Sequence, residues 1–279
     1  YHTHTTYSHG KGSVLQNAEV AAERGLKEIA ITDHGLRHVC FGIRRRKLPA
    51  LKNDCAVATE KTGVHVLAGV ENNFCDFYGS LDAKADDLER LDIVQGGYHK
   101  VVWSPTFGQT LSFQMRNLIR SYCSKSPAKL IVRNTDAYLK LIDNYELDFI
   151  GHLNRDIRAD ALTIARYAKE KGTYIEINCK ELGKYKALSI TDAELEKMTE
   201  EGVEFICNSD AHCPERVGDM SAALELIERL HIPYDQIANW EKFPSFRSHN
   251  YKRATDNRHD YNTDADKPSG EAEGESHVD

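Results

Sequence analysis

The sequence predicts an α/β fold with a parallel sheet, and two observations support this prediction. Six short apolar runs rich in Ile, Val and Phe recur along the chain, and amphipathic stretches separate them. Strands that alternate with helices form βαβ units, whose strands are parallel. A chain of 279 residues, 41% hydrophobic and 28% charged, has the size and composition of a globular α/β protein.

The predicted strands resemble the buried strands of parallel sheets, which are apolar on both faces. The apolar runs lie within residues 26–34, 64–71, 91–99, 147–152, 173–178 and 203–212. A further strand is expected to run into Tyr1, which brings the number to seven. Such strands can form an open doubly wound sheet or a closed barrel, and the pattern fits both.

Helices are expected between the strands, over residues 13–24, 50–61, 136–145, 159–171, 191–201 and 220–230. Two of them begin with the spacing of a capping box, formed by Ser13 with Gln16 and by Thr191 with Glu194. Residues 104–129 carry no clear strand pattern and are expected to form a helical insertion or a long connection.

One folded domain is expected over residues 1–246, followed by a disordered tail over residues 247–279. The tail is nearly free of aliphatic side chains and mixed in charge. Such a segment cannot bury enough apolar surface to offset the entropy lost on ordering.

Composition argues against several classes of protein. The net charge of −7 is unlike the basic character of proteins that bind long nucleic acids or membrane surfaces. No run of 18 apolar residues could span a bilayer, and no glycine-rich nucleotide-binding motif follows a strand. The seven cysteines are scattered and form no C-x-x-C pair, a pattern typical of reduced thiols in the cytoplasm.

Side chains that bind metals follow nearly every predicted strand. The exception is the strand over residues 173–178, which ends at Asn178. Since the carboxyl ends of parallel strands collect at one edge or one barrel mouth, these side chains are expected to meet. A single histidine after a strand is usually structural, but six such strand ends are not explained in that way. The candidates are His2, His4, His34, Glu71, His99, His152, Asp210 and His212.

With His9 from the opening stretch YHTHTTYSHG, the set contains seven imidazoles and two carboxylates. Mg²⁺ and Ca²⁺ prefer oxygen ligands, so this set suits Zn²⁺, Mn²⁺ or Fe²⁺ better. Nine ligands exceed the needs of a single open catalytic ion. A centre of two to three divalent ions with a bridging carboxylate is therefore expected.

The ordered motifs HTHTTYSH, ITDHG, GVE, GGYH, GH and NSDAH resemble those of the PHP (polymerase and histidinol phosphatase) superfamily of metal-dependent phosphoesterases. The resemblance extends over about residues 1–240 and is strongest to stand-alone bacterial phosphatases. It implies a distorted (β/α)7 TIM-like barrel with a trinuclear metal site at the C-terminal ends of the strands. Family members often carry His-Pro where this chain has His152 and Leu153, a departure that keeps the ligand.

The resemblance also implies how the ligands are divided among three ions. The implied sets are His2, His4, Glu71 and Asp210; Glu71 again with His99 and His152; and His9, His34 and His212. The implied reaction is hydrolysis of a small phosphorylated metabolite, as in histidinol phosphatases, by a hydroxide held at the metal site. Glu71, Asp210 and Asp33 are the carboxylates assigned to catalysis, and Asp33 could either orient an imidazole or cap its loop.

Phosphate substrates also require cations and polar groups around the metals. The basic segment GLRHVCFGIRRRKLP follows the strand over residues 26–34 and is expected to be a phosphate-gripping lid or a solvated loop. Other candidates lie shortly after ligand histidines or at the end of the strand over residues 173–178. The expected substrate contacts are Lys11, His38, Arg44, Arg45, Arg155, Asn178, Lys180 and Arg216.

Three other functions stay open at this point. Amidohydrolase barrels also begin with His-x-His, but they commonly use a bridging lysine where this chain has Glu71. A nuclease acting on oligonucleotides is chemically close, although the net charge argues against long nucleic acids. A non-catalytic, metal-stabilised module would be expected to lack several of the nine ligands.

Overall fold

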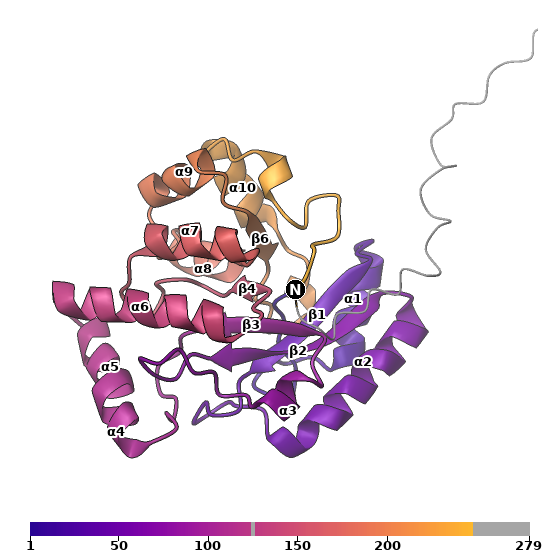
Figure 1. Cartoon of the computed structure of the whole chain (residues 1–279). Helices are drawn as coiled ribbons and strands as arrows, with labels where there is room; N and C mark the ends of the chain where they lie inside the picture. The colour runs from indigo at the N-terminus through magenta and orange to yellow at the C-terminus, as the bar shows by residue number, and fades with distance from the viewer. Residues whose placement is uncertain (124–125, 248–279) are drawn as a thin grey trace, which may run out of the picture.

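The computed structural model describes residues 1–123 and 126–247, which form a single sheet surrounded by helices (Figure 1). Except for Arg247, the tail expected over residues 247–279 lies outside the described residues. In the described part of the chain, no helix has the length and apolar character needed to cross a membrane.

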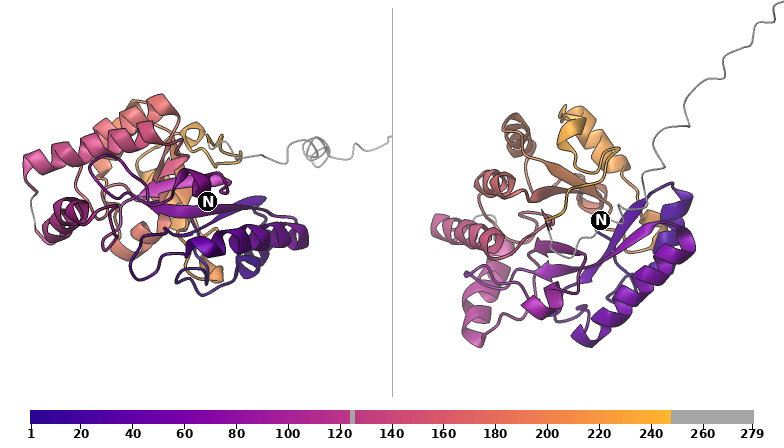
Figure 2. Two further views of the ribbon diagram at one scale, coloured as in Figure 1. Left: turned by 60° about the horizontal axis from the view of Figure 1, so that its bottom comes forward. Right: turned by 45° about the vertical axis from the view of Figure 1, so that its right-hand side comes forward.

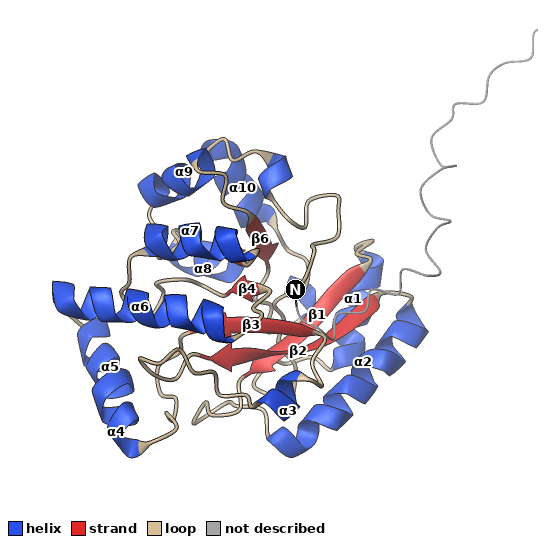
Figure 3. Ribbon diagram, viewed as in Figure 1, coloured by secondary structure: helices blue, strands red, loops and turns tan. Residues whose placement is uncertain are grey.

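The sheet contains six parallel strands, which pair in the order in which they occur along the chain. Each strand coincides with one of the six apolar runs, although β2 extends two residues beyond its run to Asn73, so the predicted parallel α/β fold is confirmed. The sheet is curled, with its strands at the centre of the molecule and the helices around them (Figure 3). The strands are β1 (Glu28–His34), β2 (His65–Asn73), β3 (Ile93–Gly97), β4 (Phe149–Ile150), β5 (Tyr174–Asn178) and β6 (Phe205–Asn208).

The first residues of the chain lie between the two edge strands, β1 and β6. The N–H of Thr32 in β1 donates to the carbonyl of Thr3 at 2.9 Å, and the amino group of Tyr1 donates to Oδ1 of Asn208 at 2.9 Å. Thr3 also forms an isolated parallel bridge with Ala211. The strand expected to run into Tyr1 is therefore present as one bridge, and the N-terminus lies near the middle of the molecule (Figure 1).

All six expected helices are present, and two of them begin with the predicted capping boxes. The expected insertion contains three short helical pieces, and a further helix directly after β5 was not expected from the sequence. The longer helices are α1 (Val14–Glu23), α2 (Leu48–Thr62), α6 (Ala128–Asn144), α7 (Ala161–Lys171), α8 (Cys179–Tyr185), α9 (Asp192–Glu200) and α10 (Ser221–Arg229). The shorter ones are η1 (Arg45–Lys47), α3 (Ala85–Leu88), α4 (Phe107–Gln109), η2 (Thr110–Met115), α5 (Arg116–Ser121), η3 (Pro214–Arg216) and η4 (Tyr234–Gln236).

Apolar side chains pack the helices against the outside of the sheet. One cluster joins α1 and α2 to β1 and β2, and a larger one joins α6, α7, α9 and α10 to the later strands. Figure 2 shows these helices along the outer side of the strands from two further directions. A third cluster takes one residue from each strand and fills the inside of the curl. Its strand residues are Ala30, Leu67, Ile93, Phe149, Tyr174 and Ile206.

The inner face of the sheet changes character toward the carboxyl ends of the strands. Alternate residues of a strand face the same side of the sheet. The residue two positions after each strand residue of the third cluster therefore also points inward. At that level the inner face carries the buried polar residues Thr32, Gln95, Glu176 and Asn208. Two residues further along the chain come His34, Glu71 and Asp210. Along the inner face of the sheet, strand periodicity therefore places an apolar level first, a polar level next and the metal-binding side chains last, at the carboxyl ends of the strands.

Candidate metal centre

Glu71, in the second half of β2, lies within 3.2 Å of four imidazoles. Its Oε1 atom is 2.6 Å from Nε2 of His152, 3.1 Å from Nε2 of His99 and 3.2 Å from Nε2 of His2. Its Oε2 atom is 2.8 Å from Nδ1 of His34. A carboxylate that approaches imidazoles through both of its oxygens has the arrangement expected of a bridging ligand.

Asp210, two residues beyond β6, is the second carboxylate of this cluster. Its Oδ1 atom is 3.2 Å from Nε2 of His4 and 3.4 Å from Nδ1 of His212. The Nε2 atoms of His2 and His4 are 3.2 Å apart. Because His2 also contacts Glu71, the two carboxylates belong to one continuous group of candidate ligands.

The backbone adopts a left-handed conformation at two of these residues. The φ angle is 33° at His152 and 47° at Asp210. Positive φ is uncommon for residues other than glycine, and such positions occur often at functional sites. The N–H of His152 donates to Oε2 of Glu176 at 2.8 Å, which stabilises the backbone at this turn.

Several buried polar atoms of the cluster have no hydrogen-bond partner among the described residues. They include Nδ1 of His34, Nε2 of His99 and Oε2 of Glu71, because the short contacts between these side chains lack hydrogen-bond geometry. Buried polar atoms nearly always have a partner, and these three residues offer ligand atoms within 4.8 Å of one another. Imidazole nitrogens and a carboxylate oxygen that converge in this way fit a divalent transition metal. Two further groups meet the same distance condition: His2, His4 and Asp210, and His4, His34 and His212.

His9, which the resemblance assigns to the third ion, lies beside the third group. Its ring centroid is 4.4 Å from that of His212 and 4.8 Å from that of His34. Phe41 stacks against His9 at 4.4 Å. In the described structure His4 occupies the place in this group that the resemblance gives to His9.

The charges of the site favour a bound cation. Burial opposes a charge on His2, but Glu176 most strongly, then Glu71 and Asp210, raises its pKa to about 10, so these carboxylates attract positive charge and a bound ion would displace the proton of this ring. Burial also opposes a charge on Glu71, yet the surrounding imidazoles, His99 first, hold its pKa well below the usual range. Burial lowers the pKa of His99 to about 3, so this ring is neutral at pH 7 and available as a ligand.

Glu176 is a functional carboxylate that reasoning from the sequence missed. Its Oε1 atom is 2.8 Å from Nδ1 of His2 and accepts from Nδ2 of Asn208 at 3.0 Å. Such a partner fixes the orientation of a ligand imidazole and raises its basicity. The available signal was a charged residue between Tyr174 and Asn178 on the inner face of a buried strand, where a charge needs a partner.

Two amides from neighbouring strands also lie against these imidazoles, and Asn73 offers an acceptor as Glu176 does. Oδ1 of Asn73 is 2.9 Å from Nδ1 of His99, which leaves Nε2 of that ring facing Glu71. Nε2 of Gln95 is 3.1 Å from Nδ1 of His2. Both amides lie on the strands that carry ligands, and their spacing to those ligands follows from the two-residue period of a strand.

Asp33 supports the loop between His4 and His9. It accepts from the backbone N–H of Thr5 at 2.8 Å and from the Thr5 and Ser8 hydroxyls. Of the two roles considered for Asp33, the structure favours loop capping, since no imidazole of the described residues is among its hydrogen-bond partners.

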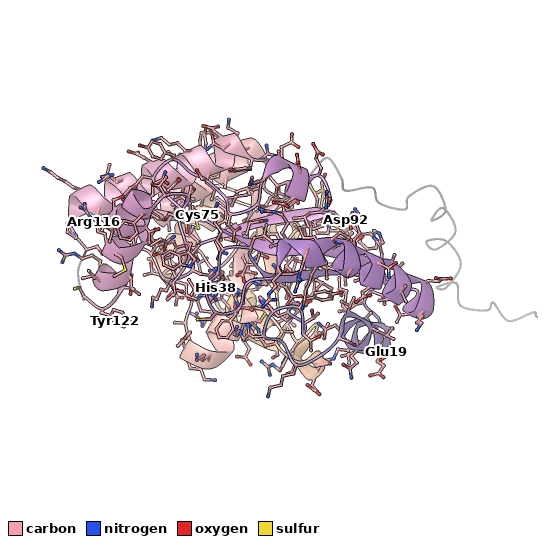
Figure 4. The ribbon with its side chains drawn as sticks, turned by 90° about the horizontal axis from the view of Figure 1, so that it is seen from below. Glu19, His38, Cys75, Asp92, Arg116 and Tyr122 are labelled. Atoms are coloured by element: carbon pink, nitrogen blue, oxygen red, sulfur yellow. The ribbon has the colours of Figure 1, made fainter. Side chains whose placement is uncertain are left out.

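A cleft of about 570 Å³ opens over the cluster. His9, His34, His99 and His212 line its floor, and residues of α8 and the segment 187–189 form one wall. His38 also lines it, with its ring 5.0 Å from that of His34. Seen from below, His38 lies between the α5 side of the molecule, marked by Arg116 and Tyr122, and the α1 side, marked by Glu19 (Figure 4).

Two of the expected substrate-binding cations reach this cleft. Nζ of Lys180 lies 3.3 Å from Oδ1 of Asp210, and a guanidinium nitrogen of Arg155 lies 3.5 Å from Oδ2 of the same carboxylate. Lys100 and Lys184 line the cleft as well. These two lysines were missed. Lys100 directly follows His99, so the proximity to a ligand that selected Arg155 could have found it, whereas Lys184 follows no recognised motif.

The other expected contacts are placed elsewhere by the structure. Arg45 pairs with Asp87 of α3 at 2.7 Å, and Arg216 pairs with Asp219 at 2.9 Å, so neither guanidinium lines the cleft. Asn178 lies buried below the metal-binding residues, where it caps α8 and donates to Oδ2 of Asp210 at 3.2 Å. The two remaining candidates are exposed and do not line the cleft: Lys11 and Arg44.

The chain is similar to proteins of one family along most of its length. A model of the PHP domain matches residues 1–180. A protein of Acetivibrio thermocellus named "Probable phosphatase" is 28% identical over 259 residues, which cover 88% of this chain and 92% of that protein. A similarly named protein of Thermoanaerobacter is 32% identical over 248 residues, covering 85% of this chain and 88% of the relative.

A solved structure has the same fold. The histidinol phosphate phosphatase of Lactococcus lactis, crystallised with zinc, L-histidinol and phosphate, superimposes with a TM-score of 0.59. The two sequences are 18% identical, and the match covers 89% of this chain and 96% of the other. The relatives favour phosphate ester hydrolysis over the amidohydrolase and non-catalytic alternatives. The chain therefore belongs to the PHP domain family and is a phosphoric ester hydrolase.

Proposed function

We propose that this protein is a phosphomonoesterase that hydrolyses a small phosphorylated metabolite at a centre of two to three divalent ions. The observation that carries the proposal is the position of Glu71, whose two oxygens approach imidazoles on both sides. Three overlapping groups of candidate ligands support more than one ion. Zinc is the first metal to test, because the Lactococcus lactis phosphatase was crystallised with it.

The proposal also concerns how the sheet closes into a barrel. We infer a distorted seven-stranded barrel in which the N-terminal segment occupies the place between β1 and β6. The hydrogen bonds of Thr3 to Thr32 and the bridge to Ala211 support this arrangement. It would bring His2 and His4 into the mouth that the other six strand ends form.

The chain's own residues account for ion binding and substrate positioning. The ions would be held by seven imidazoles and two carboxylates: His2, His4, His9, His34, His99, His152, His212, Glu71 and Asp210. When bound, divalent ions supply Lewis acidity and lower the pKa of a coordinated water. Lys100, Arg155, Lys180 and Lys184 face the same cleft and would bind the phosphoryl oxygens and offset their charge.

The size and lining of the cleft favour a small substrate. A volume of about 570 Å³ falls within the range of about 300–1,000 Å³ typical of sites for small molecules. Four cationic side chains on its walls suit a phosphorylated compound. L-Histidinol phosphate is a direct first candidate, since the Lactococcus lactis phosphatase was crystallised with histidinol and phosphate.

The test is phosphate release by purified protein supplied with Zn²⁺, Mn²⁺ or Fe²⁺. The substrates would be p-nitrophenyl phosphate, bis(p-nitrophenyl) phosphate and a panel of phosphorylated metabolites, with p-nitroacetanilide to detect amide hydrolysis. The Glu71→Gln variant is expected to lose metal-dependent turnover, whereas the exposed Glu23→Gln on α1 retains it. Undiminished turnover by Glu71→Gln, or faster hydrolysis of the anilide than of any phosphate ester, would contradict the proposal.

A further inference from the structure

A second, smaller cavity lies beside the metal cleft. Its volume is about 60 Å³, and four cationic side chains line it together with one carboxylate, Asp156. The cations are Lys100, Arg120, Arg155 and Arg158. They come from three separate parts of the chain: the segment after β3, helix α5 and the segment after β4. We call this cavity the side pocket.

The side pocket is adjacent to the metal cleft, and the two cavities share wall residues. Lys100, Arg155 and Asp156 line both cavities. Nζ of Lys100 lies 2.9 Å from Oδ1 of Asp156, and Nε of Arg155 lies 3.6 Å from the other oxygen of that carboxylate. A guanidinium nitrogen of Arg155 is also 3.5 Å from Asp210. One arginine side chain therefore separates the side pocket from the candidate metal ligands.

The positive charge of the side pocket is not balanced by the protein. Asp156 already contacts Lys100 and Arg155. Arg120 and Arg158 are exposed, and neither forms an ion pair with any residue that the structure describes. Four cations line a pocket whose wall holds one carboxylate, Asp156, and among the described residues only Arg155 of the four also contacts a second, Asp210, in a chain whose net charge is −7. Such a local excess attracts an anion.

The polar amides of the pocket wall are already engaged. Nδ2 of Asn117 donates to Oδ1 of Asn134 at 3.3 Å, and Nδ2 of Asn154 donates to the carbonyl of Ala159 at 3.1 Å. Among the cations of the described pocket wall, Arg120 and Arg158 are the two without an ion pair and can bind a ligand. A volume of about 60 Å³ holds about two waters at about 30 Å³ each, which suits a small anion better than a ring.

We propose that the side pocket binds a second phosphate group of the substrate, so that this enzyme prefers small metabolites that carry two phosphates. The proposal rests on the proposed phosphatase function: one phosphate would be hydrolysed at the metals, and the other would be held by Arg120 and Arg158. Arginine suits this role because its planar donors match phosphate oxygens in pairs.

The first experiment compares substrates that differ by one phosphate. Turnover by the metal-loaded full chain would be measured on matched pairs, such as sugar and inositol monophosphates and the corresponding bisphosphates. The Arg120→Ala/Arg158→Ala variant is expected to lose at least tenfold in kcat/KM for bisphosphates and to stay within about twofold for monophosphates. Arg90→Ala, which precedes β3 at the opposite end of the sheet, is the matched control and is expected to change neither. Equal losses on both members of each pair would overturn the proposal.

The second experiment measures binding without turnover. Calorimetric titration of the metal-loaded chain with inorganic phosphate is expected to show two sites per chain. The double variant is expected to retain one. A single phosphate site in the unchanged protein, or two sites in the double variant, would contradict the proposal that the side pocket binds phosphate. If no ester is hydrolysed but one phosphate site depends on Arg120 and Arg158, the proposed function fails and the anion site stands.

Discussion

Oε1 of Glu176 lies 2.8 Å from Nδ1 of His2, and both side chains are fully buried. This contact links the polar level of the sheet interior to the candidate metal ligands above it. It leaves Nε2 of His2 to face Glu71 at 3.2 Å. The orientation of a ligand at the start of the chain therefore depends on a carboxylate in β5, 174 residues away.

Replacing Glu176 should weaken metal binding without removing a ligand. Glu176→Gln takes away the negative charge that orients His2, and the loss of such a partner typically costs about 10–100-fold in metal affinity. Competition with a chromophoric chelator would measure the change. Glu170→Gln, on the exposed face of α7, is the matched control. Equal chelator competition by the two variants would show that Glu176 does not support the site.

Asp33 variants should separate loop support from proton transfer. Burial raises the pKa of Asp33, while its bonds to Ser8 and Thr5 oppose that shift. Asp33→Ala leaves the buried N–H of Thr5 without its partner, at a cost of about 1–3 kcal/mol. Asp33→Asn retains an acceptor for this N–H and should keep more stability and activity than the alanine variant. If Asp33→Asn is stable but loses turnover as completely as Glu71→Gln, Asp33 takes part in the chemistry.

Removing metal should destabilise the protein. Two buried carboxylates and several buried imidazoles lie within a few ångströms of one another, so an ion that binds only the folded chain stabilises it. The expected effect is about 2.7 kcal/mol at a metal concentration 100 times Kd, or about 5–10 °C in the thermal midpoint. Differential scanning fluorimetry with and without a chelator, followed by Zn²⁺ addition, would measure it. An unchanged midpoint in both steps would contradict the metal centre.

Arg45 should matter for stability and not for turnover. Burial opposes ionisation of Asp87, but Nε of Arg45 and the N–H of Lys84 hold its pKa below the usual value. A lowered pKa stabilises the fold above about pH 3.9, and this stabilisation is lost as the pH falls through the folded-state value. Arg45→Ala is expected to cost about 0.2–1 kcal/mol at pH 7, because Arg45 is largely exposed. The difference from the unchanged protein should shrink below about pH 4.

The same variant tests the alternative of a phosphate-gripping lid. Its kcat/KM for p-nitrophenyl phosphate is expected to stay within about twofold of the unchanged protein, because Arg45 is paired with Asp87 outside the cleft. Arg46→Ala, exposed and without an ion pair among the described residues, is the matched control for stability. A tenfold rise in KM for Arg45→Ala alone would restore the lid interpretation.

The strands and most candidate ligands could be predicted from the sequence because each carries a local signal. A buried parallel strand is an apolar run, and a side chain such as Glu71 or His99 directly follows one. Glu176 carries a weaker signal, since it lies inside a strand whose end shows no ligand. Lys100 carries the signal of its place directly after His99, whereas Lys184 carries none, because only the packing of α8 around the cleft brings it there.

By itself, the sequence determined the parallel α/β order, the helix starts and the residue types at the strand ends. These depend on apolar periodicity and capping, which act over a few residues. Tertiary structure alone decided which side chains meet: Glu176 with His2, Arg45 with Asp87, and Arg120 with Arg158 in one pocket. Those contacts join positions far apart in the chain, so their distances depend on how the strands curl and how the helices pack around them.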